Sequence, residues 1–212
     1  MEHVRQARNL GNEGTRLFED LRHNYPSVRN MLLTGCNGGE GTTTLSLALA
    51  MAARKLDDAR ILLIDADFAD AALSRSIGAG DAEGLRDLGD NPGDYTRHLI
   101  RLEDGTSVLP AGRLPVDMAD LKRDGTLQAL VDAALVSHDF VFWDTEAING
   151  SANTKILMAV VPDVILVTES DRTRMDHFTA CLHEIASLRA RTLAVLRNRA
   201  GRRAFSMGAD QQ

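Results

Sequence analysis

The stretch Met31–Ala52, which reads MLLTGCNGGEGTTTLSLALAMA, constrains the fold more than any other part of the chain. Its first four residues are apolar or β-branched, as is typical of a short buried strand. A glycine-dense loop follows at Gly35–Gly41, and Thr43–Ala53 is rich in Ala and Leu, which favours a helix. A strand, a glycine loop and a helix in this order form a phosphate-binding loop, or P-loop. The glycines let backbone N–H groups turn inward at the positive end of the helix dipole, so the pocket favours an anion.

The loop departs from the usual P-loop pattern at one position. That pattern ends in Gly-Lys followed by Ser or Thr, whereas this loop ends Gly41-Thr42-Thr43. Thr43 can still supply the hydroxyl that binds Mg²⁺, but the ammonium that grips the β- and γ-phosphates is missing. We therefore expect a nucleotide-binding loop that lacks the cation that binds the β- and γ-phosphates.

Acidic residues follow two apolar strands further along the chain. Arg60–Asp67 ends in Asp65-Ala66-Asp67, and Asp139–Asp144 ends in an acid. Carboxylates at the C-terminal ends of parallel strands face the ligand crevice of an open sheet. An apolar strand that closes in Asp after a P-loop is typical of a Walker B acid, which orders Mg²⁺. We therefore predict that Thr43, Asp67 and Asp144 bind the metal, and that Asp67 and Asp144 are the catalytic residues if the protein is active.

The rest of the chain alternates between helical and extended patterns. Helices are predicted at Glu13–Asn24, Ala71–Ile77, Met118–Ser137 with a break near Asp124-Gly125, and Thr173–Leu188, and strands at Thr106–Leu109, Val164–Thr168 and Thr192–Leu196. Residues 1–12 are expected to be loose, and 78–94 to be a surface loop with one helical turn. This alternation predicts an α/β fold with a mostly parallel central sheet and helices on both faces. We expect one domain over residues 1–200 and a flexible polar tail over 201–212.

Composition narrows the class of protein. A chain of 212 residues, 44% of them apolar, can form one large α/β domain, and its net charge of −6 argues against nucleic acid as the main partner. No apolar run approaches the roughly 18–20 residues that span a bilayer, and the N-terminus lacks an apolar signal region. We therefore expect a cytoplasmic protein that could sit at the inner membrane through a partner. Cys36 and Cys181 match no metal or disulfide pattern, so both are expected to be reduced.

Several motifs together resemble one known group of proteins. GEGTTTLSLALA, ILLIDADF, GLRDL, VLPAG, DFVFWDT and a late strand ending in Asn look like the cytoplasmic kinase domain of bacterial tyrosine kinases of the CpsD/CapB type. These kinases belong to the deviant-Walker P-loop ATPases that include MinD and ParA. The resemblance extends from about Leu17 to Arg199. It implies a P-loop nucleotide-binding fold, and a place beside a membrane-embedded co-polymerase in the synthesis and export of capsule or exopolysaccharide.

The resemblance also implies roles for particular residues. The Walker A′ acids fall on Asp65 and Asp67, the Walker B acid falls on Asp144, and the Asn that contacts the base falls on Asn198. ATP or ADP would be bound by Gly38, Gly39, Glu40, Gly41, Thr42, Thr43, Thr44 and Asn198.

The chain departs from the kinase pattern in ways that bear on activity. Thr42 stands where those kinases have their catalytic lysine, and Glu146 adds negative charge beside the expected triphosphate site. The helical motif Glu-x-x-Arg-x-x-Arg, which those kinases use for ring assembly, reads Arg16-x-x-Glu19-x-x-Arg22 here. The chain also lacks their C-terminal tyrosine cluster, so self-phosphorylation on such a cluster is excluded. We expect weakened nucleotide binding and little or no phosphoryl transfer.

Our leading hypothesis is a degenerate kinase-like protein that acts by contact, as a regulator or scaffold, and that assembles with itself or with an export component. The alternatives are an active ATPase or tyrosine kinase with a non-standard P-loop, and a positioning ATPase of the MinD/ParA type. An active enzyme would need a substitute cation, for which Lys155, Arg172 and Arg174 are candidates, although each is more simply a solvated surface charge. Glu40 and Glu169 are likewise expected to be surface or loop charges.

Overall fold

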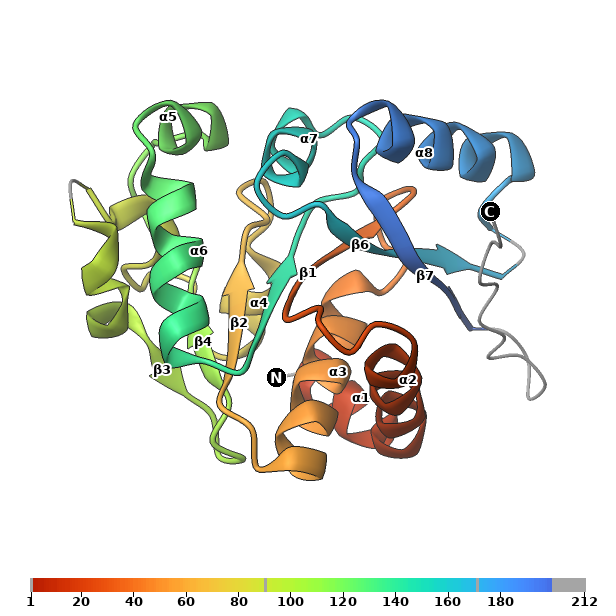
Figure 1. The fold of residues 1–212 in the computed structure, drawn as a ribbon, viewed down its shortest axis with the longest axis horizontal. Coiled ribbons are helices and arrows are strands. Elements are labelled where there is room, and N and C mark those ends of the chain that lie inside the picture. The colour runs from red at the N-terminus through yellow and green to blue at the C-terminus, as the bar shows by residue number, and fades with distance from the viewer. Residues whose placement is uncertain (1, 90, 171, 200–212) are drawn as a thin grey trace.

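The computed structural model describes residues 2–89, 91–170 and 172–199, and a seven-stranded sheet forms its centre (Figure 1). The strand order is β3-β4-β2-β5-β1-β6-β7, and every neighbouring pair is parallel except β3 with β4 at one edge. The predicted, mostly parallel sheet is thereby confirmed. The strands are β1 (Asn30–Gly35), β2 (Ile61–Asp65), β3 (Ile100–Arg101), β4 (Ser107–Leu109), β5 (Phe140–Asp144), β6 (Asp163–Glu169) and β7 (Arg191–Asn198).

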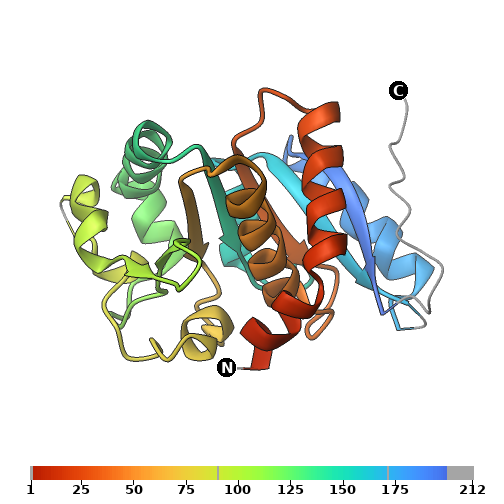
Figure 2. The same cartoon turned by 90° about the horizontal axis from the view of Figure 1, so that it is seen from below.

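Helices cover both faces of the sheet, as Figures 1 and 2 show from two directions. The first face carries α1 (Glu2–Asn9), α2 (Gly11–Asn24) and α3 (Thr42–Asp57). The second face carries α5 (Met118–Arg123), α6 (Thr126–Ser137), α7 (Ala152–Met158) and α8 (Met175–Ser187). The short helix α4 (Ala72–Ser76) follows β2, and two 3₁₀ helices, η1 (Leu85–Asp87) and η2 (Pro92–His98), precede β3.

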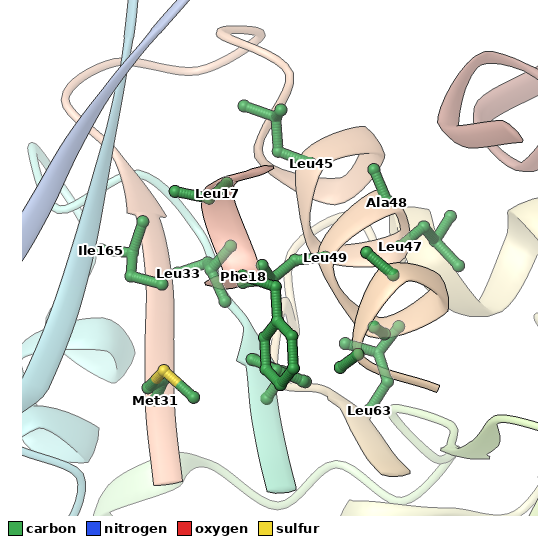
Figure 3. Close-up of a cluster of buried hydrophobic side chains, with 14 of the residues drawn as sticks. Leu17, Phe18, Met31, Leu33, Leu45, Leu47, Ala48, Leu49, Leu63 and Ile165 are labelled. Atoms are coloured by element: carbon green, nitrogen blue, oxygen red, sulfur yellow. The ribbon is translucent and has the colours of Figure 1, made fainter. Parts of the chain in front are cut away.

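A cluster of buried apolar side chains closes the first face (Figure 3). Leu17 and Phe18 of α2 pack against α3 and the sheet, and the Phe18 ring meets the Phe140 ring edge-on with 5.0 Å between centroids. From β1 this cluster takes Met31 and Leu33, whereas the cluster on the second face takes Leu32. Side chains alternate along a strand, so this short apolar run contributes to both cores and holds the start of the P-loop firmly.

The N-terminal segment differs from its prediction. Glu2–Asn9 is not loose but forms α1, which packs against α3 beside the P-loop. The sequence hides this helix because Ala7 is its one residue in the buried core, and polar contacts hold the rest: Arg8 pairs with Glu103 at 2.6 Å, and the His3 ring hydrogen-bonds to Thr44.

The other differences concern short elements. The predicted loop over residues 78–94 contains η1 as expected and the start of η2, which was not predicted; nor were α7 and the two-residue strand β3. The break in the long helix is confirmed, since α5 and α6 meet at Asp124 and Gly125. The predicted tail over 201–212 lies outside the described residues.

Candidate functional site

A pocket of about 790 Å³ opens at the C-terminal ends of the parallel strands, as expected for a ligand site in a sheet of this type. Its walls come from α1, the P-loop and the start of α3, and the loops that follow β2, β5 and β7. Among the residues predicted to bind nucleotide or metal, the pocket is lined by Gly38, Gly39, Gly41, Thr42, Thr43, Thr44, Asp67 and Asn198.

Two predicted site residues lie behind the pocket wall. The structure places Glu40 inside the protein with 1% of its surface exposed, and Asp144 beneath the pocket floor with 0% exposed. Each therefore acts on the site through neighbouring groups rather than by facing the open pocket.

The P-loop has the backbone geometry that an anion cradle requires. Gly39 and Gly41 have φ angles of 82° and 91°, a conformation that residues with a side chain rarely adopt. A Cβ at Gly41 would also clash with the Asn198 carboxamide. The chain then enters α3, whose N-terminus presents unpaired N–H groups and a partial positive charge.

Glu40 holds the P-loop in place: it lies in the loop, one of the two predicted settings, but is buried there rather than exposed at the surface. Its carboxylate accepts a hydrogen bond from the Asn37 backbone N–H at 3.0 Å and another from the Thr173 hydroxyl. Thr173 lies between β6 and α8, and its hydroxyl also accepts from the Glu169 N–H at 2.8 Å. The loop after β6 is thus tied to the back of the P-loop.

Asn198, the predicted base-contacting residue, lies against the P-loop. Its side-chain nitrogen donates to the Glu40 carbonyl oxygen, and its side-chain oxygen accepts from the Arg199 N–H, both at 2.8 Å. The end of β7 is thereby joined to the P-loop, and the carboxamide stands at the pocket wall.

Asp144 has an unusual electrostatic environment. Ser46 donates to its Oδ1 at 2.9 Å and Thr43 donates a further hydrogen bond, yet its Oδ2 is buried without a partner among the described residues. Burial, followed by the negative charge of Asp65 on the neighbouring strand, raises the pKa of Asp144 well above its usual range.

Asp65 and Asp67 differ although both follow the same strand. Asp65 is buried and accepts from the N–H and hydroxyl of Ser74, at 2.8 and 2.6 Å, so it anchors α4; burial raises its pKa to about 6. Asp67 lines the pocket and accepts from the N–H groups of Ala69 and Asp70. Burial raises the pKa of Asp67, and the charge of Glu146 adds to this effect.

The donor set fits Mg²⁺. An orphaned, buried carboxylate oxygen on Asp144, the Thr43 hydroxyl and the Asp67 carboxylate are hard oxygen ligands of the kind this ion prefers. Among the described residues, no three His, Cys, Asp or Glu side chains are grouped to hold a metal alone. In proteins Mg²⁺ is usually held by one or two carboxylates together with substrate phosphates and water.

The candidate cations are placed very differently. Lys155 pairs with Glu184 of α8 at 3.0 Å, and Arg174 pairs with Asp176 at 3.0 Å, so neither faces the pocket. Arg172 lies against the P-loop, with a guanidinium nitrogen 3.4 Å from where a Cβ on Gly39 would stand.

Glu169 positions two arginines beside the P-loop. It binds Arg172 at 3.3 Å and Arg199, a pocket residue, at 2.7 Å. These pairs, with Arg199 first, lower the pKa of Glu169, whose side chain is only 10% exposed. Glu169, predicted to be a surface or loop charge, is thus an ion-paired residue at the end of β6.

Sequence reasoning missed the contribution of α1 to the site. His3, Gln6 and Asn9 are spaced three residues apart, so they share one helix face, and all three line the pocket. The Nδ1 atom of His3 lies 2.9 Å from the Thr44 hydroxyl. The regular polar spacing was the available signal, but it carries no hydrophobic periodicity.

A comparison of the whole chain with family models gives a match to the family described as cellulose biosynthesis protein BcsQ, over residues 28–199. Among individual relatives, the chain is 25% identical over 170 residues to tyrosine-protein kinase YwqD of Bacillus subtilis, covering 79% of this chain and 70% of YwqD. It is 27% identical over 157 residues to the tyrosine-protein kinase candidate EpsB of Ralstonia nicotianae, covering 73% of this chain but 21% of EpsB.

Solved structures confirm the fold. The chimerical protein CapA2B2 superposes with a TM-score of 0.81 at 21% identity, covering 89% of this chain and 84% of that one. The kinase domain of VpsO gives 0.78 at 22% identity, covering 94% and 97%. Cobyrinic acid a,c-diamide synthase from Mycobacterium smegmatis, solved with bound ADP and magnesium, gives 0.62 at 20% identity, covering 81% and 76%. The predicted P-loop fold and the relationship to bacterial tyrosine kinases are thereby confirmed.

Proposed function

The chain belongs to the family of the cellulose biosynthesis protein BcsQ, and from this premise we propose that it is a degenerate, kinase-like P-loop protein. It acts as a regulator or scaffold in the synthesis and export of cellulose or a related exopolysaccharide. It holds ATP or ADP with Mg²⁺ weakly and turns nucleotide over slowly or not at all.

One observation carries this proposal: Thr42 occupies the lysine position of a pocket whose charged lining residues are mostly acidic. Asp67, Asp70 and Glu146 line the pocket together with Arg199, and Asp144 lies beneath it. A lost charge-assisted contact weakens binding by about 1.5–3 kcal/mol. In the transition state, losing one electrostatic stabiliser costs about 10²–10³ in rate. Nucleotide binding should therefore be weak, and phosphoryl transfer should be slow or absent.

Without the lysine, separate groups would bind the phosphates and the metal ion. The N–H groups of the P-loop face the phosphates, while Thr43, Asp67 and Asp144 are the residues that would hold Mg²⁺. When bound, that ion supplies positive charge beside the phosphates, which the acidic wall would otherwise repel. Binding should therefore depend on Mg²⁺ more strongly than in a P-loop that keeps its lysine.

The two tyrosines support a role other than self-phosphorylation. Tyr95 is 1% exposed, and its hydroxyl lies 3.3 Å from the His138 ring, while the Tyr25 ring is partly covered by the Arg191 guanidinium.

Among the described residues no helix is both long and apolar enough to cross a membrane. We propose that the chain reaches the inner membrane by docking on a membrane-embedded export component.

A steady-state measurement of ATP turnover with Mg²⁺ tests the catalytic half of this proposal. We expect purified wild-type protein to stay at the buffer background. Turnover in the ordinary enzymatic range of about 1–10³ s⁻¹ would refute it.

An active ATPase is the second candidate, because Arg172 lies against the P-loop and could serve as a relocated cation. If that is so, wild-type protein hydrolyses ATP and Arg172→Ala abolishes hydrolysis. Lys155→Ala is the matched control, since Lys155 is paired with α8 and away from the pocket.

A further inference from the structure

The chain has two cysteines, and the fold brings them together. Cys36 opens the P-loop and Cys181 lies in α8, yet both belong to the same buried cluster and each is 0% exposed. Both are free thiols, and their side chains lie close enough to interact with each other.

Backbone geometry explains the contact. Side chains alternate along β1, so Leu32 and, just past the strand, Cys36 point to the face that α8 covers. On α8, Cys181 and Ile185 are one helical turn apart and are the buried residues of that helix. The meeting of the thiols thus follows from the packing of α8 on the sheet.

The thiol pair lies directly behind the P-loop. The Glu40 carboxylate acts electrostatically on both sulfurs, and the Asn149 side chain hydrogen-bonds to Cys181. Asn149 also reaches the side chain of Asn37, the residue after Cys36, at 3.4 Å. Because Asn37 directly follows Cys36 in the chain, a displacement of the sulfurs should also displace the P-loop.

We propose that Cys36 and Cys181 form an oxidative modification site, at which a peroxide converts the two thiols into an intrachain disulfide that ties the P-loop to α8. The occupant of this site is a small peroxide such as H₂O₂, which reaches the sulfurs when the loop opens locally.

The chemistry balances in two steps. One of the two thiolates attacks one oxygen of H₂O₂ and breaks the O–O bond, which gives a sulfenic acid and releases hydroxide. The other sulfur then attacks the sulfenic sulfur and displaces its oxygen, which leaves as water with the protons of both thiols accounted for. In total, two thiols are oxidised and one H₂O₂ is reduced to two waters.

A disulfide would displace the P-loop. Its sulfurs stand about 2.05 Å apart, which is closer than two unbonded thiols can approach, so Cys36 and α8 must move toward each other. The N–H groups of the cradle follow Cys36 directly in the chain. Because misplacement by about 1 Å can cost 10²-fold in a preorganised site, we expect oxidised protein to bind Mg²⁺·ADP at least tenfold more weakly. This consequence rests on the proposed function, but formation of the disulfide does not.

Intact-mass and peptide-mapping measurements on folded protein treated with H₂O₂ test the proposal. We expect the mass of two hydrogens to be lost, with a bridge mapped between Cys36 and Cys181 that dithiothreitol reverses. Neither Cys36→Ser nor Cys181→Ser should form an intrachain bridge, and Cys181→Ser, which leaves the loop sequence intact, should keep the Mg²⁺·ADP affinity of reduced wild type.

Two free thiols after excess peroxide, a bridge between two molecules, or sulfinic acid without a bridge would each overturn the proposal. Complete bridging with unchanged Mg²⁺·ADP affinity would overturn its link to the P-loop. Failure of reduced protein to bind Mg²⁺·ADP would instead refute the proposed function, and the mass measurement would still decide whether the disulfide forms.

Discussion

The Asp144 carboxylate is completely buried and accepts hydrogen bonds from Ser46 and Thr43, yet one of its oxygens has no partner among the described residues. An unpaired, buried acceptor costs free energy, and a buried charge costs more. Such a group is retained where a ligand offsets the cost, and a bound divalent cation would do so here. In its absence, the residue should destabilise the protein.

We therefore predict that Asp144→Asn stabilises the metal-free protein. Asparagine keeps an acceptor for Ser46 but removes the ionisable group, so a gain of about 1 kcal/mol would raise Tm by about 2–4 °C. The variant should also lose the Tm increase that Mg²⁺ with ADP gives wild type. Differential scanning calorimetry checks both effects.

Asp139→Asn, immediately before the start of β5, is the matched control. Asp139 pairs with Arg60 at 2.9 Å near the surface, so its loss should lower Tm slightly and leave the response to Mg²⁺·ADP intact. A lower Tm in metal-free Asp144→Asn would contradict the metal-site assignment.

Asp65 gives the protein a pH dependence with a definite sign. Its pKa rises from 3.8 in the unfolded chain to about 6 in the fold, so between these values the folded state binds more protons. Its contribution to stability is therefore fully present below about pH 4 and is lost as pH rises through about 6, a change of up to about 3 kcal/mol.

Urea titrations of metal-free wild type and Asp65→Asn across pH 4–7 measure this contribution. Relative to the variant, wild type should lose unfolding free energy as pH rises. Parallel pH profiles would show that Asp65 does not titrate in this range.

Among the elements, the loop between β6 and α8 makes the contacts that hold the P-loop in position. It supplies Thr173 as a partner of Glu40 and places Arg172 against Gly39, and Glu169 at the end of β6 holds Arg172. The end of β7 adds Asn198 and Arg199 to the same network. The cations nearest the cradle thus belong to elements that follow it by more than a hundred residues.

We predict that Arg172→Ala weakens Mg²⁺·ADP binding by up to about fivefold, because an exposed guanidinium beside the loop contributes up to about 1 kcal/mol. Arg174→Ala is the control on the same loop, since Arg174 pairs with Asp176, whereas Arg172 lies against Gly39. Isothermal titration calorimetry measures both. Equal effects of the two variants would show that the general charge of the loop matters, and not the position of Arg172.

Local patterns predicted the parts of the site that are contiguous in the chain. The glycine loop, Thr43 and Asp67 lie where strand and helix periodicity place them, because a strand end and a helix start fix the backbone between them. The burial of Glu40 could not be predicted, since its partner Thr173 lies far along the chain and only the packing of α8 brings it close. The helix α1 was not predicted because it buries only Ala7, and α7 was not predicted because seven residues are too few to show a helical period.

In the molecule as a whole, seven strands and two helical layers frame a pocket at the C-terminal ends of the parallel strands. The fold agrees with that of the solved structures, and Thr42 stands where the usual P-loop pattern has lysine. We expect the protein to bind nucleotide weakly and to act by contact with a partner.

Calorimetric titration of wild type and Thr42→Lys with ATP and ADP, with and without Mg²⁺, tests this claim most directly. We predict that wild type binds detectably only with Mg²⁺, and that Thr42→Lys binds about 10- to 100-fold more tightly, as one restored charge-assisted contact requires. Tight binding by wild type without Mg²⁺, or no gain on restoring lysine, would contradict the account.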